Sequence, residues 1–367
     1  MQKNYNVLLE RLNIRMNPDK MMVNKSFSDE IGSIPQRGIF LYIKKAMLGV
    51  EPEYTQKSLE AGRKVKEQLQ RALDDVSFEF QGSVMTNTHI RGYSDIDLLT
   101  ICEKFYTFDR NGINATLNDY QKIVQLDRFQ IGRLQAAVSG GGYIHGIYDL
   151  RALRIDSERI LKSNYISVDD SKPKSIKVSL TNPKRDVDVV IANWYKNANF
   201  YIQEDKTLLG IKVFVKGDTP GQDKELAPDF PFLSIARINR RDSEVNGRLK
   251  KMIRFLKTLR YDSDYTDNIK LTSFDFNAIC YEIGIWKYRD KDYLDLVTVV
   301  YDQLKSLSNN PNHRNGLMSV DGYEPIFRNR DGSENTEKVQ SLKLIITEIE
   351  AVMSDIIEET LNAKLMV

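Results

Sequence analysis

The chain has 367 residues and a formal net charge of only +2, with basic and acidic residues nearly balanced. Such a balance excludes a protein that coats polyanions through bulk charge, while local basic patches stay compatible with it. This length is enough for two lobes, because domains commonly have about 100–200 residues. No run of about 18 apolar residues occurs, and the polar start lacks the apolar core of a signal peptide. We expect a cytoplasmic protein without a membrane segment.

The first 210 residues alternate helical and strand patterns. Apolar residues recur at helical spacing over residues 54–73 and again over residues 149–165, which predicts two amphipathic helices. Strands are indicated by short apolar or alternating runs bounded by turn residues. The turn at residues 181–185 separates the last two of these runs and predicts a hairpin. The predicted strands are residues 77–84, 94–102, 175–180 and 186–194.

Beyond about residue 206 a connection that contains proline and glycine leads into helical patterns that continue to the carboxyl terminus. We therefore predict a catalytic lobe at residues 1–210, which includes an amino-terminal helical extension, and a helical lobe at residues 211–367. The clearest helical patterns in the second lobe lie at residues 247–262, 271–284 and 337–361. Cys102 and Cys280 lie in apolar stretches, which fits two buried side chains in a reducing compartment rather than a disulfide.

The stretch from Gly82 to Asp97 carries the strongest chemical signal. Asp95 and Asp97 are two residues apart in an expected strand, so period-two alternation places both carboxylates on one face. Two such carboxylates repel each other unless positive charge lies between them. Mg²⁺ prefers carboxylates together with substrate phosphates, so the pair fits a metal–nucleotide site. The preceding Gly82–Ser83 turn would let a phosphate approach the backbone and receive hydrogen bonds from Ser83.

A third carboxylate is expected near this pair, because two-metal phosphoryl transfer needs a ligand for the metal that activates the attacking hydroxyl. The strand at residues 186–194 offers two candidates on one face, Asp186 and Asp188. Asp188 directly precedes the apolar run and is the candidate that we prefer. Asp186 is then expected to be a charge at the rim of the site.

The order of these motifs resembles a known signature. A Gly-Ser pair, eleven further residues, an Asp-Ile-Asp unit and a later strand aspartate resemble the nucleotidyltransferases of the DNA polymerase β superfamily. More narrowly, the chain resembles the bacterial cGAS/DncV-like nucleotidyltransferases (CD-NTases), which make cyclic oligonucleotide signals in anti-phage (CBASS) defence. The resemblance extends from the helix at residues 54–73 through the helical lobe, and it is most specific at the Gly-Ser and Asp-Ile-Asp unit.

The resemblance implies an α/β (α+β) fold, with a polymerase β-like core around a small mixed β-sheet and a helical lobe that closes a nucleotide cleft. It implies two Mg²⁺ ions, or Mn²⁺ in their place, bound by Asp95, Asp97 and Asp188. It also carries a triphosphate contact onto Lys257 and a phosphate contact onto Ser273.

The position of the lysine is open by one helical turn, because Leu259 stands where the family often has an aromatic residue. Lys250 and Lys251 are therefore alternates to Lys257. The substrates expected from the resemblance are ATP or other nucleoside triphosphates, and the expected protein partners are regulatory or effector proteins of a defence operon.

The expected reaction is template-independent synthesis of a cyclic oligonucleotide, in which a ribose hydroxyl attacks an α-phosphorus and pyrophosphate leaves. No stable DNA binding is expected, because the histidines are scattered and form no zinc-ligand pattern of the kind that helps animal DNA-sensing relatives to hold DNA. Two alternatives stay open. The first is a linear oligonucleotide synthetase or an RNA-modifying nucleotidyltransferase, and the second is a catalytically idle nucleotide-binding regulator.

Overall fold

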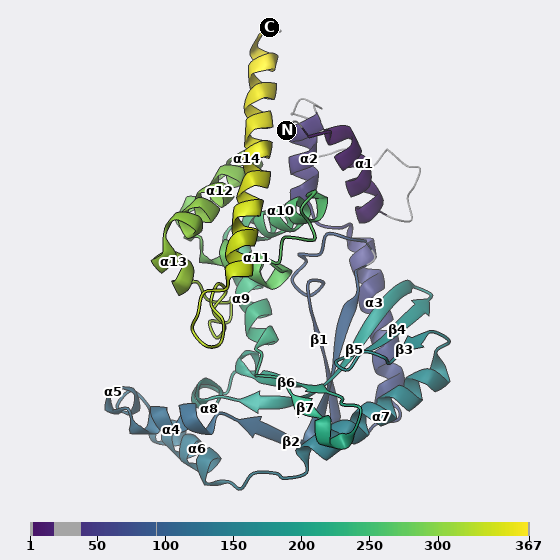
Figure 1. The fold of residues 1–367 in the computed structure, drawn as a ribbon. Coiled ribbons are helices and arrows are strands. Elements are labelled where there is room, and N and C mark those ends of the chain that lie inside the picture. Colours follow the sequence, from purple (N-terminus) through teal and green to yellow (C-terminus); the bar gives the residue numbers. More distant parts are fainter. Residues whose placement is uncertain (1–2, 18–37, 93, 366–367) are drawn as a thin grey trace. The chain divides into compact units, whose positions relative to one another are not determined.

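The structure, a computed structural model, describes residues 3–17, 38–92 and 94–365 (Figure 1). The chain forms two compact units and passes between them more than once. The sheet unit comprises residues 56–85 and 94–236, and the helical unit comprises residues 1–55, 86–93 and 237–367. Two helices run across a boundary between the units: α3 (Pro52–Gln70) and α9 (Pro231–Glu244).

The sheet unit is built on a seven-stranded mixed sheet. Its main path has the order β1-β2-β5-β4-β3, and β6 pairs with both β5 and β7. β2 and β5 run parallel, whereas every other pair is antiparallel. The strands are β1 (Val76–Gln81), β2 (Ile96–Phe108), β3 (Val168–Asp169), β4 (Ile176–Thr181), β5 (Lys184–Lys196), β6 (Gly210–Val215) and β7 (Lys224–Glu225).

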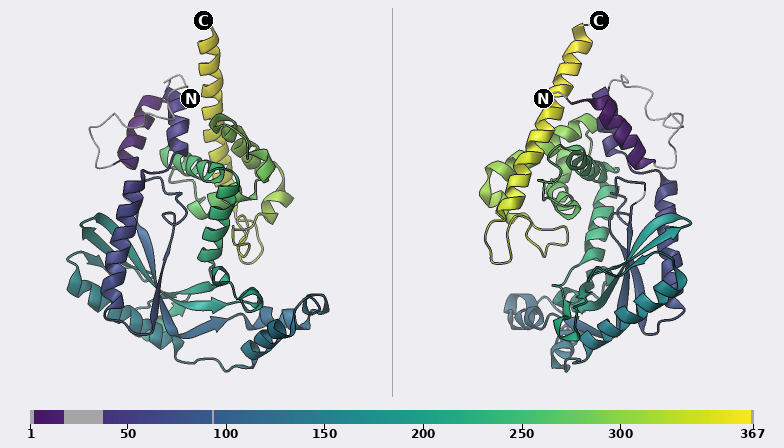
Figure 2. Two further views of the ribbon diagram at one scale, coloured as in Figure 1. Left: turned by 180° about the vertical axis from the view of Figure 1, so that it is seen from behind. Right: turned by 45° about the vertical axis from the view of Figure 1, so that its right-hand side comes forward.

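Helices α3 and α7 cover one face of this sheet, as Figures 1 and 2 show. Val65 of α3 and Leu161 of α7 are fully buried in one apolar cluster with Leu98 of β2 and Val189 of β5. Besides α3 and α9, the helices of this unit are α4 (Arg110–Asn118), α5 (Tyr120–Ile123), α6 (Arg128–Ser139), α7 (Gly146–Asn164), α8 (Ala198–Gln203), and the 3-10 turns η1 (Lys206–Leu208) and η2 (Pro220–Gln222).

The helical unit has one large apolar core to which its first and last helices both contribute. Ile43 of α2, Phe255 of α10, Val300 of α12 and Ile345 of α14 are all fully buried in it. The helices of this unit are α1 (Tyr5–Met16), α2 (Gly38–Met47), α10 (Arg248–Asp262), α11 (Ser273–Glu282), α12 (Tyr293–Asn309), α13 (Pro311–Gly316), α14 (Thr336–Leu365) and the 3-10 turn η3 (Ile285–Lys287).

The predicted elements that carry the site are present. The predicted hairpin is confirmed, since β4 and β5 pair antiparallel up to Thr181 and Lys184. Cys102 and Cys280 are buried, as expected. The stretch between α12 and α14, residues 310–335, contains the short helix α13 and two isolated bridges.

The division into units differs from the predicted boundary near residue 210. Residues 210–215 form β6, which pairs with β5 and so extends the sheet unit beyond that point. Leu12 and Ile43 of the amino-terminal helices lie in the core of the helical unit. Residues 1–210 and 211–367 are therefore not the two units, because each of those ranges contains parts of both.

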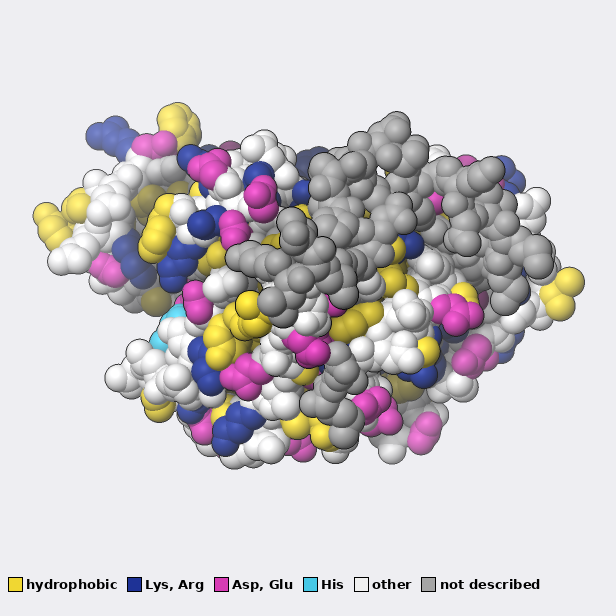
Figure 3. Space-filling view, turned by 90° about the horizontal axis from the view of Figure 1, so that it is seen from above, with side chains coloured by type: hydrophobic (Ala, Val, Ile, Leu, Met, Phe, Trp, Pro, Cys, Tyr) yellow, Lys and Arg dark blue, Asp and Glu magenta, His cyan; other side chains and the backbone are white. Residues whose placement is uncertain are grey.

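The described surface shows no broad area of one charge on the face drawn in Figure 3, where basic and acidic side chains are interspersed. This mixture agrees with the near-neutral balance of the whole sequence. Among the described helices, none combines the length and the apolar character needed to cross a bilayer.

Candidate active site

Strand pairing brings two of the predicted carboxylates side by side. In the parallel pairing of β2 with β5, Asp97 is directly opposite Asp188. Asp95 immediately precedes β2. On the other side of β2, the antiparallel pairing places Gln81, which ends β1, opposite Asp97. The predicted Gly82–Ser83 turn therefore begins beside the Asp97 position.

Both carboxylates belong to the sheet face that α3 and α7 leave uncovered. Ile96 and Leu98 of β2 belong to the cluster with those helices, and Asp97 lies between them in sequence. Leu99, two residues further along β2, belongs to a different cluster together with Val190 of β5. Because side chains alternate along a strand, Asp97 and Asp188 share the face of Leu99 and Val190. One face of these strands packs against α3 and α7 through apolar side chains, and the opposite face carries the two carboxylates.

Gly82 is required at its position for two independent reasons. Its backbone has φ of +92°, a left-handed conformation that L side chains rarely adopt. A Cβ atom added there would lie 2.7 Å from Oδ2 of Asp97, well inside contact distance. The backbone of the turn therefore approaches the carboxylate as closely as only glycine permits. This close approach confirms that the Gly-Ser turn and the Asp-Ile-Asp unit meet in space.

The local electrostatics disfavour negative charge on the two paired aspartates. Burial, together with the nearby carboxylates of Asp188 and Asp95, raises the pKa of Asp97 to about 6. Burial also raises the pKa of Asp188 above its usual range, although Lys177 opposes the shift. A group of carboxylates that repel one another in this way is stabilised by any cation that lies between them.

Asp188 and Asp186 differ sharply in their hydrogen bonding. Oδ1 of Asp188 is buried and has no hydrogen-bond partner among the described residues. Burial raises the pKa of Asp186, but hydrogen bonds from Ser179 and Lys177 outweigh it and hold that pKa below its usual range. A buried acceptor without a donor is costly unless a ligand satisfies it. The contrast is the one expected if Asp188 is a ligand and Asp186 is a rim charge.

Lys177 is a site residue that the sequence reasoning missed. It lies on β4 directly opposite Asp188, and its Nζ is 3.1 Å from Oδ2 of Asp95 and 3.0 Å from Oδ2 of Asp186. The two carboxylates hold the pKa of Lys177 above its usual range. A signal was present in the alternation of residues 175–180, which places Lys177 on the polar face of a strand next to the one that carries Asp188.

The carboxylates fit a divalent cation in charge, donor type and desolvation, since carboxylate oxygens are the ligands that Mg²⁺ prefers. As they stand, no three His, Cys, Asp or Glu side chains in the described part of the chain are arranged to hold a metal ion. Asp97 and Asp188 are adjacent, whereas the Asp95 carboxylate is paired with Lys177.

Lys257 is buried within the helical unit. Its Nζ donates a hydrogen bond of 2.6 Å to the Thr88 carbonyl oxygen, and the neighbouring Arg254 on α10 donates to the Asn87 and Met47 carbonyl oxygens. Burial, together with the positive charge of Arg254, lowers the pKa of Lys257 to about 8. Arg254 and Lys257 therefore hold residues 87 and 88, which follow the Gly82–Ser83 turn in the chain.

The other candidates for a phosphate contact lie in the helices predicted from the sequence. Lys250 and Lys251 belong to α10, and Ser273 belongs to α11. Lys250 forms an ion pair with Asp242 at 3.5 Å, so it already has a partner. Ser273 is the first residue of α11, and the Thr272 side chain caps that helix by accepting from the Asp275 backbone. Ser273 is exposed at this helix start.

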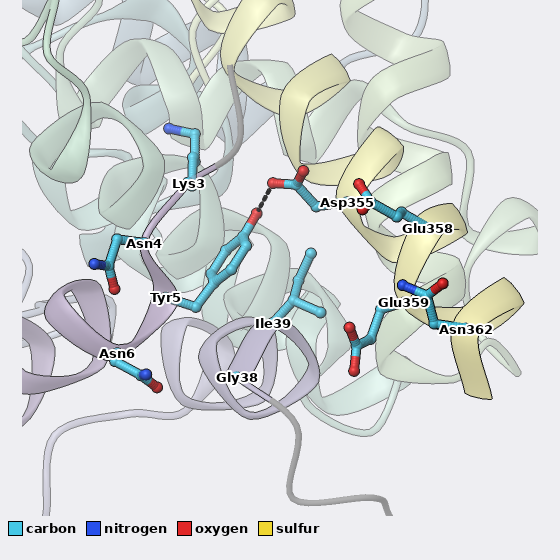
Figure 4. A pocket seen from close by; sticks show the side chains of 10 residues that line it. All are labelled: Lys3, Asn4, Tyr5, Asn6, Gly38, Ile39, Asp355, Glu358, Glu359 and Asn362. Atoms are coloured by element: carbon cyan, nitrogen blue, oxygen red, sulfur yellow. Dashed lines mark hydrogen bonds between the residues drawn. The ribbon is translucent and has the colours of Figure 1, made fainter. Parts of the chain in front are cut away.

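The helical unit also contains a pocket of about 470 Å³ that none of the predicted site residues lines. Figure 4 shows it between the amino-terminal segment, the start of α2 and the end of α14. The Tyr5 hydroxyl donates to Asp355 at 2.5 Å, and Glu358, Glu359 and Asn362 lie nearby on α14. Its lining is acidic, which does not suit an anionic nucleotide.

Two independent comparisons with known proteins indicate the same family, one for the helical region and one for nearly the whole chain. The family model of the cGAS/DncV-like nucleotidyltransferase C-terminal helical domain matches residues 236–353. A c-di-GMP synthase from Capnocytophaga granulosa is 45% identical over 360 residues, which is 97% of this chain and 98% of that protein. A c-di-GMP synthase from a Lachnospiraceae bacterium is 38% identical and covers 96% of this chain and 98% of its own length.

The fold has a solved counterpart. The structure of a STING-associated CdnE c-di-GMP synthase from Flavobacteriaceae sp. has a TM-score of 0.84 and 38% sequence identity, covering 97% of this chain and 99% of that chain. A similarity of this extent covers the sheet unit and the helical unit together.

Proposed function

The chain belongs to the bacterial cGAS/DncV-like nucleotidyltransferases, and we propose that it converts two molecules of GTP into cyclic di-GMP. Membership of this family makes it an enzyme that forms a cyclic oligonucleotide from nucleoside triphosphates. One observation carries the choice of GTP: the three relatives described above, between 38% and 45% identical along nearly their whole length, are c-di-GMP synthases.

The catalytic groups in this proposal are Asp95, Asp97 and Asp188, which would hold two Mg²⁺ ions. Metal ions held by these carboxylates would lower the pKa of the attacking ribose hydroxyl and neutralise charge on the phosphates. The opposed positions of Asp97 and Asp188 and the unpartnered buried oxygen of Asp188 support this assignment. Gly82 leaves room for the triphosphate to approach the backbone, and Ser83 would donate hydrogen bonds to it.

Lys257 and Ser273 would hold the triphosphate from the helical unit. The pKa of Lys257, about 8, keeps most of its ammonium groups charged at neutral pH, and burial makes a charge-assisted contact with phosphate stronger than at a surface. Ser273 would use its hydroxyl and the amide at the start of α11. Since phosphoryl transfer depends chiefly on positioning and on neutralising charge, these residues would act on binding and alignment.

The ring requires two transfers of the same kind. In the first, a ribose hydroxyl of one GTP attacks the α-phosphorus of the other and pyrophosphate leaves, which gives a linear dinucleotide that still carries one triphosphate. In the second, the free ribose hydroxyl of that dinucleotide attacks its own α-phosphorus, and a second pyrophosphate leaves. Ring closure is intramolecular and is therefore favoured by a high effective concentration.

The proposal is tested by incubating the full-length protein and Mg²⁺ with GTP alone, with ATP alone and with both, and identifying the products by mass. GTP alone should give the mass of cyclic di-GMP, with no terminal phosphate that a phosphatase can remove. A requirement for ATP would contradict the choice of GTP. A ladder of lengths or a need for an RNA primer would support the linear or RNA-modifying alternative, and no product at all would support the idle regulator.

The solved relative with 38% identity is STING-associated, and we extend the proposal to the receiver of the signal. The product of this chain would act on a STING-type receptor. A receptor of that type should gain thermal stability in the presence of the purified product, because a ligand that binds only the native state raises the melting temperature. The same product after phosphodiesterase digestion should have no effect.

A further inference from the structure

Lys177 contacts two carboxylates at the edge of the predicted metal site, one of which is a predicted metal ligand. We propose that Lys177 competes with the divalent metal for the carboxylate of Asp95. The inference rests on the proposed function only in taking Asp95, Asp97 and Asp188 as metal ligands.

The backbone of Lys177 is firmly placed, which limits where its ammonium can reach. Its neighbours on β4, Ile176 and Val178, are fully buried in the core beneath the sheet. Pairing of β4 with β5 sets Lys177 directly beside Asp188, on the face that carries the predicted ligands. From this position the ammonium reaches Asp95 and Asp186, at 3.1 Å and 3.0 Å.

The three predicted ligands are not equivalent. Asp97 and Asp188 already lie opposite each other, and Asp188 has a buried oxygen without a donor among the described residues. Asp95 instead accepts a hydrogen bond from Lys177. A metal that takes all three carboxylates must therefore draw Asp95 from Lys177. When the metal binds Asp95, Lys177 stays paired with Asp186. Asp186 would therefore have a role at the site without being a metal ligand.

The expected change in metal affinity is modest, because the ion pair is partly open to solvent. The side chains of Lys177 and Asp95 are 25% and 45% exposed. Exposed ion pairs are weak, so removal of the competing ammonium should tighten metal binding by about twofold to fivefold. If Lys177 instead oriented Asp95 for the metal, its removal would weaken binding.

The experiment measures Mn²⁺ binding to the metal-free, full-length protein by titration and electron paramagnetic resonance of the free ion, so that no turnover is needed. Lys177→Gln and Lys177→Met should both tighten binding, whereas Lys177→Arg, which keeps the charge, should bind like wild type. Lys162→Gln is the matched control, because Lys162 pairs with Asp170 at 2.6 Å and contacts none of the predicted ligands. It should leave the Mn²⁺ affinity unchanged. Melting temperatures of the metal-free variants check that each one is folded.

A double-mutant cycle with Asp95→Asn separates competition for Asp95 from a general effect of charge. In the Asp95→Asn background, Lys177→Gln should produce no further tightening, because the contested carboxylate is gone. Equal tightening in both backgrounds, or unchanged or weaker binding in the single variants, would overturn the inference. Suppose that the wild type makes cyclic di-GMP and binds Mn²⁺, and that Lys177→Gln binds Mn²⁺ equally well. The inference about Lys177 would then be wrong, and the proposed function would stand. Wild type that binds no Mn²⁺ and makes no product would overturn both.

Discussion

The folded protein disfavours the charged form of the Asp97 side chain, and this is the physical feature that best marks the candidate site. An aspartate usually titrates near pH 4, whereas burial and two neighbouring carboxylates raise the pKa of Asp97 to about 6. The folded state therefore favours the protonated form. Its contribution to stability is complete below the ordinary pKa and is lost as the pH rises through 6. Above that pH the metal-free site is under electrostatic strain, which a divalent cation would relieve.

Asp97→Asn should accordingly stabilise the metal-free protein at pH 7.5 and abolish product formation. A pKa shift of this size corresponds to about 3 kcal/mol, or about 6–12 °C in melting temperature for a domain of about 150–250 residues. The gain should vanish at pH 4, where the wild-type carboxyl is protonated. Thermal melting at both pH values, with a metal chelator present, measures the difference.

Asp186→Asn is the control of opposite sign. The pKa of Asp186 lies below its usual range because Ser179 and Lys177 bind its charged form, so removal of that charge should give no stabilisation at pH 7.5. If Asp97→Asn also fails to stabilise the metal-free protein, the crowding of charge described here is absent in solution.

Gly82→Ala should damage both the fold and the activity. Alanine would have to adopt the left-handed backbone conformation of Gly82, and its Cβ would collide with Oδ2 of Asp97. We therefore expect a loss of about 1–3 kcal/mol in unfolding free energy. Product formation should fall more steeply than stability, because the turn would shift away from the carboxylate. Denaturant unfolding and initial rates measure the two effects.

Gly132→Ala is the matched control for this substitution. Gly132 lies within α6, and a Cβ added there meets nothing within 4 Å. Alanine should stabilise that helix by up to about 1 kcal/mol and leave the rate unchanged. Wild-type rates in Gly82→Ala would refute the close approach of the turn to Asp97.

Among the elements, α10 carries Lys257, and if this residue contacts the triphosphate as proposed, its lowered pKa predicts a pH dependence. The value of kcat/KM for GTP reports groups of the free enzyme, so it should fall above about pH 8 as Lys257 loses its proton. Lys257→Ala should lower kcat/KM at neutral pH by about 10- to 100-fold, the range for a lost contact to a charged group, and should lack this step. Initial rates from pH 6.5 to 9.5 measure both effects.

Lys250→Ala and Lys251→Ala are the controls on the same helix. Each should keep the step near pH 8 and a rate close to that of wild type. A larger loss in either variant would move the triphosphate contact by a helical turn. A step that persists in Lys257→Ala would show that another group titrates.

The strands that carry the site were predictable because their signals are local. Asp97 and Asp188 each follow a turn and precede an apolar run, and the β4–β5 hairpin joins neighbours in sequence. That Asp97 would lie opposite Asp188 was not derivable from periodicity, since the parallel pairing of β2 with β5 joins distant segments. A third carboxylate near the pair was expected from the needs of two-metal phosphoryl transfer, and not from any local pattern. Lys177 was missed because a lone lysine on a strand is ordinarily a solvated side chain.

The short strands and the amino-terminal helices were harder to predict for a different reason. β6 lies where the sequence changes from strand to helical patterns, and β3 and β7 have only two residues each. Helices α1 and α2 belong to the core of a unit whose other helices begin more than 200 residues later, and no local pattern encodes such a contact. The composition of each unit therefore depends on tertiary pairing.

At the scale of the whole molecule, the units are interleaved along the chain rather than consecutive. The segment at residues 86–93 belongs to the helical unit, while the residues on both sides of it, which carry the Gly-Ser turn and the Asp-Ile-Asp unit, belong to the sheet unit. Arg254 and Lys257 hold this segment by its carbonyl oxygens. The stretch between the two motifs therefore includes a segment that belongs to the helical unit and contacts α10 within it.

Interleaving predicts which fragments of the chain can fold. The fragments 1–210 and 211–367, cut at the boundary that sequence patterns suggest, should show no cooperative unfolding. The first lacks Ile211 and Phe214, and the second lacks Ile43 and Met47, all of which are buried almost completely in the intact chain. Removal of large buried side chains costs several kcal/mol each, which exceeds the usual margin of stability when several are lost together.

A fragment of residues 56–236, with residues 86–93 replaced by a Gly/Ser linker of equal length, should behave differently. It retains all seven strands, α7 and most of α3, so the apolar cluster beneath the sheet stays complete. We expect a single cooperative thermal transition by circular dichroism and native-like dispersion in its NMR spectrum. It should make no product, because it lacks Lys257 and Ser273. Cooperative unfolding of the 1–210 fragment would instead show that the sheet is stable without β6. Residues 1–210 would then fold independently of the rest of the chain, although the structural units are interleaved.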